Sequence, residues 1–186
     1  MAIVMGKFEL PKRLIWDEEA ATDTYTKFIA EPFERGYGYT LGNALRRVLL
    51  SSLEGAAITD VKIDGVLHEF TTIPGVYEDV TEIILNLKKI VLKMDGREPR
   101  RIILEAKGEK EVKASHITTG GMVEIINPDQ HIARLNKGAV LKMELGEGLG
   151  RGYRPAELNK SPDAPLGVIP VDSIFSPVRK IKYDVE

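Results

Sequence analysis

The residues from Thr40 to Ser52 carry the pattern that most restricts the fold of this chain. Apolar side chains recur there at intervals of three and four residues, which is typical of an amphipathic α-helix. Thr40 is a suitable N-cap, because its hydroxyl can accept a hydrogen bond from an early backbone N–H. We expect the apolar face to be core; it consists of Leu41, Ala44, Leu45, Val48 and Leu49.

The opposite face of this predicted helix carries two arginines and a leucine. Its members are Asn43, Arg46, Arg47 and Leu50. One interpretation is a solvated arginine face with a single outward leucine, which is common on protein surfaces. The other is a helix held between two neighbours, because arginine is enriched at interface hot spots, where its planar fork forms several bonds. The pattern alone leaves both open.

Glycines precede and enter this helix at Gly36, Gly38 and Gly42, which raises the alternative of a phosphate-binding loop. A dinucleotide fingerprint needs glycine at its first, third and sixth positions, and the sixth position from Gly36 is Leu41. A P-loop needs a lysine after its second glycine, and none lies between Lys27 and Lys62. A small nucleotide-binding enzyme is therefore the alternative, not the leading hypothesis.

A second glycine-rich run, "LGEGLGRGYRP" at residues 145–155, supports the same alternative only weakly. Its backbone N–H groups could surround an anion. Turns and bulges that let the chain approach another surface closely are the favoured interpretation. The partner of this segment is not identified by its sequence.

The rest of the chain predicts strands around one more helix, and hence an α+β fold. Two short strand-like stretches, at residues 7–17 and 23–33, come before the first helix. Strict alternation predicts further strands at residues 59–65, 140–146 and 179–186. A helical stripe with acids at its start and lysines at its end predicts a helix within residues 77–93.

Composition excludes several classes of function. The 186 residues are 43% hydrophobic with a formal charge of -2, so the chain can bury a core and has no basic arm for nucleic acid. The lack of cysteine excludes disulfides and thiolate metal sites, and it fits a cytoplasmic setting. No apolar run is long enough to span a membrane.

The remaining titratable residues do not predict a catalytic or metal site, and we predict no cofactor. The three histidines are far apart; a metal site through Asp129 and His131 is disfavoured, and His116 is better explained as a structural histidine. Glu78 and Asp79 begin the second predicted helix, where negative charge is expected without any catalytic role.

Long collinear segments resemble one known family. The run "EPFERGYGYTLGNALRRVLLSSLEGAAITDVKIDGVLHEFTTIPGVYEDVTEIILNLKKI", followed by "GRGYRPA" and "IPVDSIFSPVRKIKYDVE", is similar to the amino-terminal domain of the alpha subunit of bacterial DNA-directed RNA polymerase. The resemblance covers nearly the whole chain. It implies a non-catalytic platform that dimerises and then holds the beta and beta-prime subunits.

The resemblance also implies two subdomains. Residues 1–52 with 168–186 would form a discontinuous dimerisation subdomain, and residues 53–167 an insert within it. Members of this family continue past "KYDVE" with a second dimerisation helix, a linker and a DNA-binding carboxy-terminal domain. We therefore expect no direct DNA binding by this chain, and a homodimer with a second alpha subunit is not established by the resemblance.

The resemblance assigns interface roles by position. The position of Arg47 is a principal contact to beta, with Leu50, Arg46 and Asn43 beside it. The positions of Lys88 and Val171 belong to the beta-prime surface, and neighbouring Val178 and Lys180 are weaker candidates. An equally simple interpretation of Lys88 is a solvated lysine whose charge complements the helix dipole. The dimerisation helix would use the apolar face described above.

Overall fold

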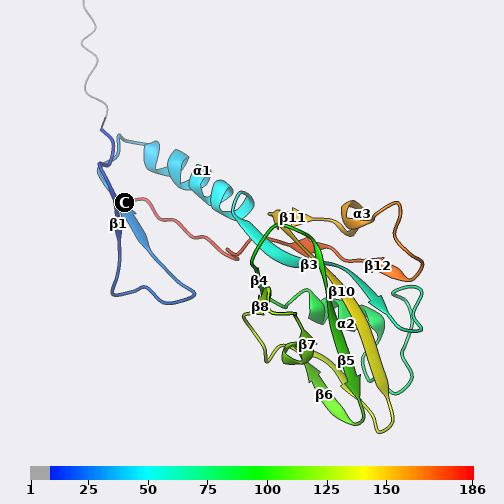
Figure 1. The fold of residues 1–186 in the computed structure, drawn as a ribbon. Coiled ribbons are helices and arrows are strands. Elements are labelled where there is room, and N and C mark those ends of the chain that lie inside the picture. Colours follow the sequence, from blue (N-terminus) through cyan, green and yellow to red (C-terminus); the bar gives the residue numbers. More distant parts are fainter. Residues whose placement is uncertain (1–8) are drawn as a thin grey trace, which may run out of the picture. The chain divides into compact units, whose positions relative to one another are not determined.

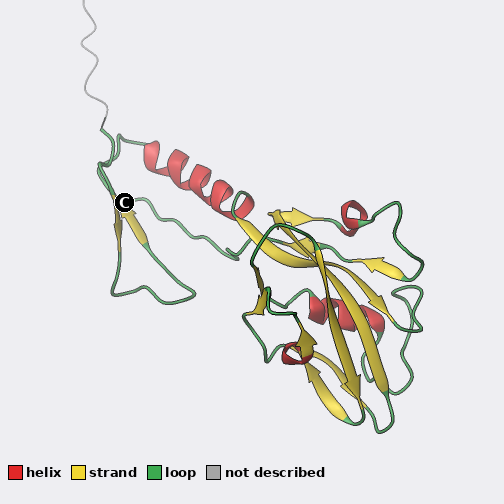
Figure 2. Cartoon of the chain, in the orientation of Figure 1, coloured by secondary structure: helices red, strands yellow, loops and turns green. Residues whose placement is uncertain are grey.

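The computed structural model describes residues 9–186, which divide into two compact units. Among the described residues, the first consists of residues 9–48 with Lys180–Glu186, and the second of Leu49–Arg179. The α+β class predicted from the sequence is confirmed by the mixture of helices and strands (Figures 1 and 2). The predicted subdomain boundaries, at residues 52/53 and 167/168, stay a prediction.

The first unit contains a short antiparallel hairpin and most of one helix. Strand β1 (Leu14–Trp16) pairs with β2 (Phe28–Ala30), with Ile15 opposite Ile29. Both lie within the predicted strand-like stretches, although Lys7 and Phe8 of the first stretch lie outside the described residues. The unit continues into helix α1 (Tyr37–Ser51), whose last three residues belong to the second unit.

Helix α1 begins three residues earlier than predicted. Gly36 has φ of 87°, a left-handed conformation that glycine adopts readily, and the chain turns there into the helix. The backbone N–H of Tyr37 then donates to the carbonyl of Glu34. Thr40 is inside the helix, so its prediction as the N-cap is wrong.

The predicted last strand, residues 179–186, is also wrong as a strand. These residues form no strand in the structure, and they lie along α1 instead. Val185 and Tyr183 contact the helix at Gly38 and Gly42, where a Cβ atom would come within 2.8 Å of Val185 Cγ1 and within 2.5 Å of Tyr183 Cδ2. Apolar and polar residues alternate at 181–185 because one side of this segment is covered by α1. The segment is not paired with another strand.

The second unit is built on an antiparallel sheet of seven strands. Its centre is formed by β3 (Glu54–Ile63), β10 (Val140–Arg151) and β5 (Arg100–Lys107), with β10 between the other two. The full order is β7-β5-β10-β3-β4-β8, and β12 also pairs with β3. The shorter strands are β4 (Leu92–Met94), β7 (Ile117–Thr118), β8 (Val123–Ile125) and β12 (Val168–Pro170).

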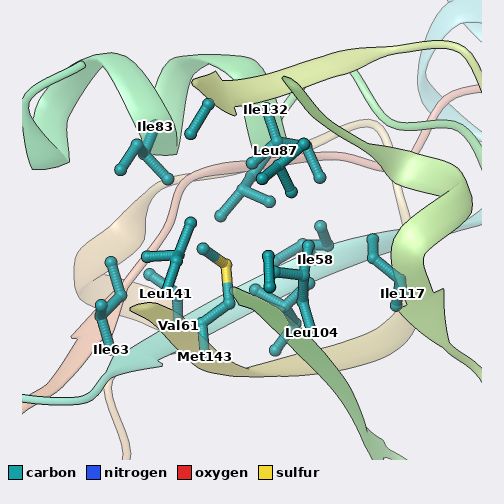
Figure 3. Packing of buried hydrophobic residues seen from close by; sticks show 14 of the residues in the cluster. Ile58, Val61, Ile63, Ile83, Leu87, Leu104, Ile117, Ile132, Leu141 and Met143 are labelled. Atoms are coloured by element: carbon teal, nitrogen blue, oxygen red, sulfur yellow. The ribbon is translucent and has the colours of Figure 1, made fainter. Parts of the chain in front are cut away.

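One face of this sheet is covered and forms the core. Figure 3 shows Ile83 and Leu87 of helix α2 (Val80–Leu87), with Ile132, facing side chains of the sheet such as Val61 and Leu104. The pair β6 (Lys110–Lys113) and β9 (His131–Leu135) contributes further buried residues. Smaller elements complete the unit: η1 (Ala114–His116), β11 (Tyr153–Arg154), α3 (Ala156–Asn159) and β13 (Ser173–Ile174).

Helix α2 is shorter than the predicted range of 77–93. It starts at a capping box, in which Asp79 Oδ1 accepts from the Glu82 N–H at 2.7 Å and Glu82 Oε2 accepts from the Asp79 N–H at 3.3 Å. It ends at Leu87, and Leu92 already belongs to β4. Val91 is four residues from Leu87 and so matched the helical stripe, but it lies outside the helix and is exposed.

The outer face of the sheet carries an ion pair that spans three strands. Asp60 on β3, Gly146 on β10 and Arg101 on β5 are in register, and Arg101 Nη2 lies 2.9 Å from Asp60 Oδ1. A Cβ atom at Gly146 would overlap the Asp60 carboxylate. The missing side chain of Gly146 is what allows the two charged groups to meet across the middle strand.

Candidate subunit interface

Helix α1 is exposed along the face that the sequence predicted to be core. It has no buried residue: Leu45 and Val48 are 51% and 54% exposed, Ala44 is exposed, and Leu41 and Leu49 are half-buried. The prediction that these five residues form a core face is therefore wrong for the chain by itself. An apolar stripe left open to solvent is typical of a surface that binds another protein.

The arginine face of α1 is mostly exposed, as predicted. Asn43, Arg46 and Arg47 are exposed, whereas Leu50 is half-buried and does not project freely into solvent. Since exposure is required of an interface residue but does not identify one, the beta-contact role of these four residues stays a prediction. The helix thus offers two different surfaces, one apolar and one cationic.

The glycines of α1 serve packing in place of ligand binding. Gly38 and Gly42 face Val185 and Tyr183 of the same unit, so their open sides are filled by the chain itself. Hollows of about 340 and 520 Å³ occur on the second unit, and neither is lined by these glycines or by residues 145–155. Nothing in this arrangement supports the nucleotide-binding alternative.

We expect Gly42→Leu to detach the carboxy-terminal segment from α1. The helix itself gains about 1 kcal/mol from losing a glycine, but the new side chain occupies the position of the Tyr183 ring. Limited trypsin digestion should then cleave faster after Lys180 and Lys182. Asn43→Leu, on an exposed position of the same helix, is the control and should leave the cleavage rate unchanged. Equal rates in the parent and in Gly42→Leu would contradict the packing described.

Most of the second glycine cluster is strand. Gly146, Gly148 and Gly150 belong to β10, with a bulge between Gly146 and Glu147. Gly152 has φ of 60° and forms a bend between β10 and β11, so the expected turns and bulges are found at these two places. A Cβ at Gly150 would lie 2.6 Å from Phe175 Cδ2. The glycines of β10 let the Phe175 ring and the Asp60–Arg101 pair approach the strand closely. That the run also contacts another subunit stays a prediction.

The hairpin of the first unit exposes a further apolar surface that the sequence did not single out. Trp16, the single tryptophan of the chain, is 55% exposed. Its neighbours in β1 and the facing residues of β2 are exposed as well: Leu14, Ile15, Phe28 and Ile29. The sequence predicted only that these stretches are strand-like, and within the described residues of this unit nothing covers their apolar side chains.

Lys88 is part of a polar network in the second unit. Its Nζ lies 2.5 Å from Asp172 Oδ2, and the Tyr153 hydroxyl donates to the same oxygen at 3.3 Å. Burial of the hydroxyl, followed by the charge and the hydrogen bond of Asp172, raises the pKa of Tyr153. Lys88 is thus held by a carboxylate that the sequence analysis did not identify; Asp172 and Tyr153 are separated from it by too many residues for any local pattern to connect them.

The other residues assigned to the beta-prime surface lie in different environments. Val171 is 1% exposed and belongs to the core, because its N–H donates to the Thr59 carbonyl and fixes the segment against β3. Its side chain is therefore not presented to a partner in this structure. Val178 is half-buried in the second unit, and Lys180 is exposed in the first.

Two of the histidines have partners within the chain: His116 Nδ1 accepts from the Lys113 N–H at 2.9 Å, and His131 contacts two carboxylates. His131 lies between two carboxylates, with Nε2 2.9 Å from Glu78 Oε1 and Nδ1 3.0 Å from Glu111 Oε1, while Asp129 pairs with Lys113 instead. Across residues 9–186, no group of three or more His, Cys, Asp or Glu is arranged to hold a metal. In the same range no helix is both long and apolar enough to cross a membrane.

Two units of this kind, one with an exposed helix and hairpin and the other with a curled antiparallel sheet, define a protein of α+β class. Residues 61–176 match the model of the RNA polymerase Rpb3/RpoA insert domain. The chain belongs to this family.

Curated relatives agree with this membership. The chain is 62% identical over 167 residues to a DNA-directed RNA polymerase subunit alpha of Symbiobacterium thermophilum, covering 90% of this chain and 53% of the relative. Proteins of the same name from Alkaliphilus oremlandii and Geobacter metallireducens are 61% and 58% identical, covering 89% and 94% of this chain and 52% of each relative. The chain spans about half the length of the curated relatives it matches.

Proposed function

We propose that the chain is a non-catalytic assembly subunit of DNA-directed RNA polymerase, acting in the cytoplasm. The observation that carries the proposal is helix α1, which leaves both its apolar and its arginine-bearing faces at the surface. A helix that is exposed on both sides gains stability when neighbours cover it. The names of the relatives, each a polymerase subunit alpha, support polymerase as the assembly concerned.

Each face is proposed to bind a different neighbour. The arginine face, with Arg47 at its centre and Asn43, Arg46 and Leu50 around it, binds the beta subunit. The apolar face of α1 binds a second copy of the chain. The beta-prime subunit is proposed to bind at Lys88, which Asp172 and Tyr153 hold in place, with Val178 and Lys180 as further candidates.

Self-association is supported by the amount of apolar side chain left open in the first unit. Leu45 and Val48 of α1 are more than half exposed, and so is Trp16 of the hairpin. Surfaces of this kind are removed from water at homodimer interfaces, which are more apolar than transient ones. The proposal therefore includes a second alpha subunit even though the chain spans only about half of its relatives.

Sedimentation velocity of the chain over a range of concentrations tests this part of the proposal. The parent chain should sediment faster as its concentration rises, and Leu45→Glu should remain a monomer, because a carboxylate cannot be buried unpaired at an apolar interface. Asn43→Glu adds the same charge on the other face and should associate as the parent does. A parent chain that is monomeric at every concentration would remove the homodimer from the proposal while leaving beta binding to be tested by titration.

A further inference from the structure

Glu147 is an acidic residue in the interior of the sheet. It is 1% exposed, and neither of its carboxyl oxygens has a hydrogen-bond partner among the described residues. It follows Gly146 at the bulge of β10, where it lies opposite Ile58 on β3 and opposite Arg100 on β5. The α1 surfaces and the proposed subunit contacts make no use of it.

An ionised carboxylate without a partner is strongly unfavourable in such a position, because its charge has left water and nothing replaces the lost hydration. Burial raises the pKa of Glu147, and the nearby Arg100 guanidinium acts in the opposite direction with a smaller effect. The arrangement in the structure is therefore suited to the neutral carboxyl.

Of the two residues that face Glu147 across the sheet, Arg100 is the one that can pair with the charged form. On β3, Ile58 is apolar, and the charged pair of Asp60 with Arg101 is formed next to it, opposite Gly146. On β5, Arg100 stands directly across from Glu147, on the same side of the sheet by register. Its guanidinium contacts the sulfur of Met122, a thioether that is only a weak acceptor.

We propose that Glu147 is a proton-controlled switch: its neutral carboxyl stays buried as seen here, and loss of its proton to solvent draws the Arg100 guanidinium from Met122 onto the carboxylate. The exchange is favourable in that direction because a thioether is a weak acceptor, whereas a hydrogen bond between a guanidinium and a carboxylate is strengthened by both charges. Arg100 is the first residue of β5, and the carbonyl of Met122 accepts from Asp95 N–H, so the movement alters the end of the sheet near β8.

The switch has a defined sign. Because the folded chain holds the Glu147 proton to a higher pH than the unfolded chain does, unfolding releases a proton in the interval above the ordinary pKa of 4.5. The contribution of Glu147 to folding stability is therefore fully present below that value, and it is lost as the pH rises through the pKa of Glu147 in the folded chain. Glu147→Gln removes this loss, since its amide cannot ionise.

The test is an NMR titration of the whole chain labelled at methionine methyl and glutamate carboxyl carbons. The Glu147 carboxyl should titrate at higher pH than it does in the urea-unfolded chain, and the Met122 methyl should shift with the same midpoint. In Glu147→Gln the Met122 methyl should lose this pH dependence, whereas Glu144→Gln, at an exposed position of the same strand, should keep it. Arg100→Ala should move the Glu147 midpoint to still higher pH.

Two results would overturn the proposal, and both come from the parent chain, so neither depends on a variant folding. A Met122 methyl that does not move at the Glu147 midpoint excludes the transfer of Arg100. A Glu147 carboxyl that titrates as in the unfolded chain excludes the buried neutral state itself.

Discussion

Leu104→Ala is expected to destabilise the second unit by about 2 to 5 kcal/mol. Leu104 is fully buried at the centre of β5, in contact with the cluster between the sheet and α2 (Figure 3). Removing three carbons there costs the transfer free energy of the lost groups and leaves a cavity that the surrounding strands cannot close. Urea unfolding followed through amide signals of β3, β5 and β10 measures the loss in this unit alone.

The next residue along the same strand supplies the control. Ile103 points to the outer face of the sheet and is 54% exposed, so Ile103→Ala should change the free energy of unfolding by about 0.5 kcal/mol or less. Comparable losses for the two variants would mean that the outer face of the sheet is covered as well, which would contradict the exposure of Ile103. The same reasoning lowers the loss of stability expected for Leu45→Ala. The sequence predicted Leu45 to be core, and in the structure its side chain is 51% exposed.

Arg47→Ala is expected to weaken binding of the beta subunit by roughly 2 kcal/mol or more, about a thirtyfold increase in Kd. The arginine is at the middle of the proposed beta surface on α1, and its planar fork can make several hydrogen bonds while its stem covers apolar surface. Isothermal titration of beta into the chain measures the effect, and circular dichroism of the variant establishes that the fold is retained.

Arg47→Lys keeps the positive charge but removes the planar guanidinium, so it distinguishes the effect of the charge from that of the hydrogen-bond geometry. If the guanidinium geometry matters, lysine at this position should recover only part of the affinity, because an ammonium group cannot make the paired bonds. Lys142→Ala, which removes an exposed cation from the second unit, should leave beta binding unchanged. A correctly folded Arg47→Ala that binds beta as tightly as the parent would refute the assignment of this face.

Local pattern was sufficient where one periodicity held over a long segment. The alternation at residues 59–65 and 140–146 marked the two central strands of the sheet, and the acids before Val80 marked the start of α2, where Asp79 proved to be the N-cap. Local pattern was insufficient at residues 87–92, where the spacing of a helix and the alternation of a strand overlapped. Leu87 and Val91 satisfied the helical spacing, although Ile90 and Leu92 were the buried pair and belonged to the approach to β4.

Burial was the quantity that the sequence could not supply. The apolar stripe of α1 has the same spacing whether its cover is the chain itself or another molecule, so the pattern gave the helix but not its environment. The reverse difference occurs at Val171, which the resemblance assigned to the beta-prime surface and whose side chain is buried in the core. The Lys88–Asp172 pair could not be predicted, because it joins residues distant in sequence that only the folded sheet brings together.

The ion pair that reaches over Gly146 has a consequence for how this unit can vary in evolution. Residues 60, 101 and 146 lie on three separate strands, yet each restricts the others: any side chain at the middle position would displace the carboxylate, and without the carboxylate the guanidinium loses its partner. We expect homologous chains to change these positions together, with a larger residue at 146 accompanied by uncharged residues at the flanking two.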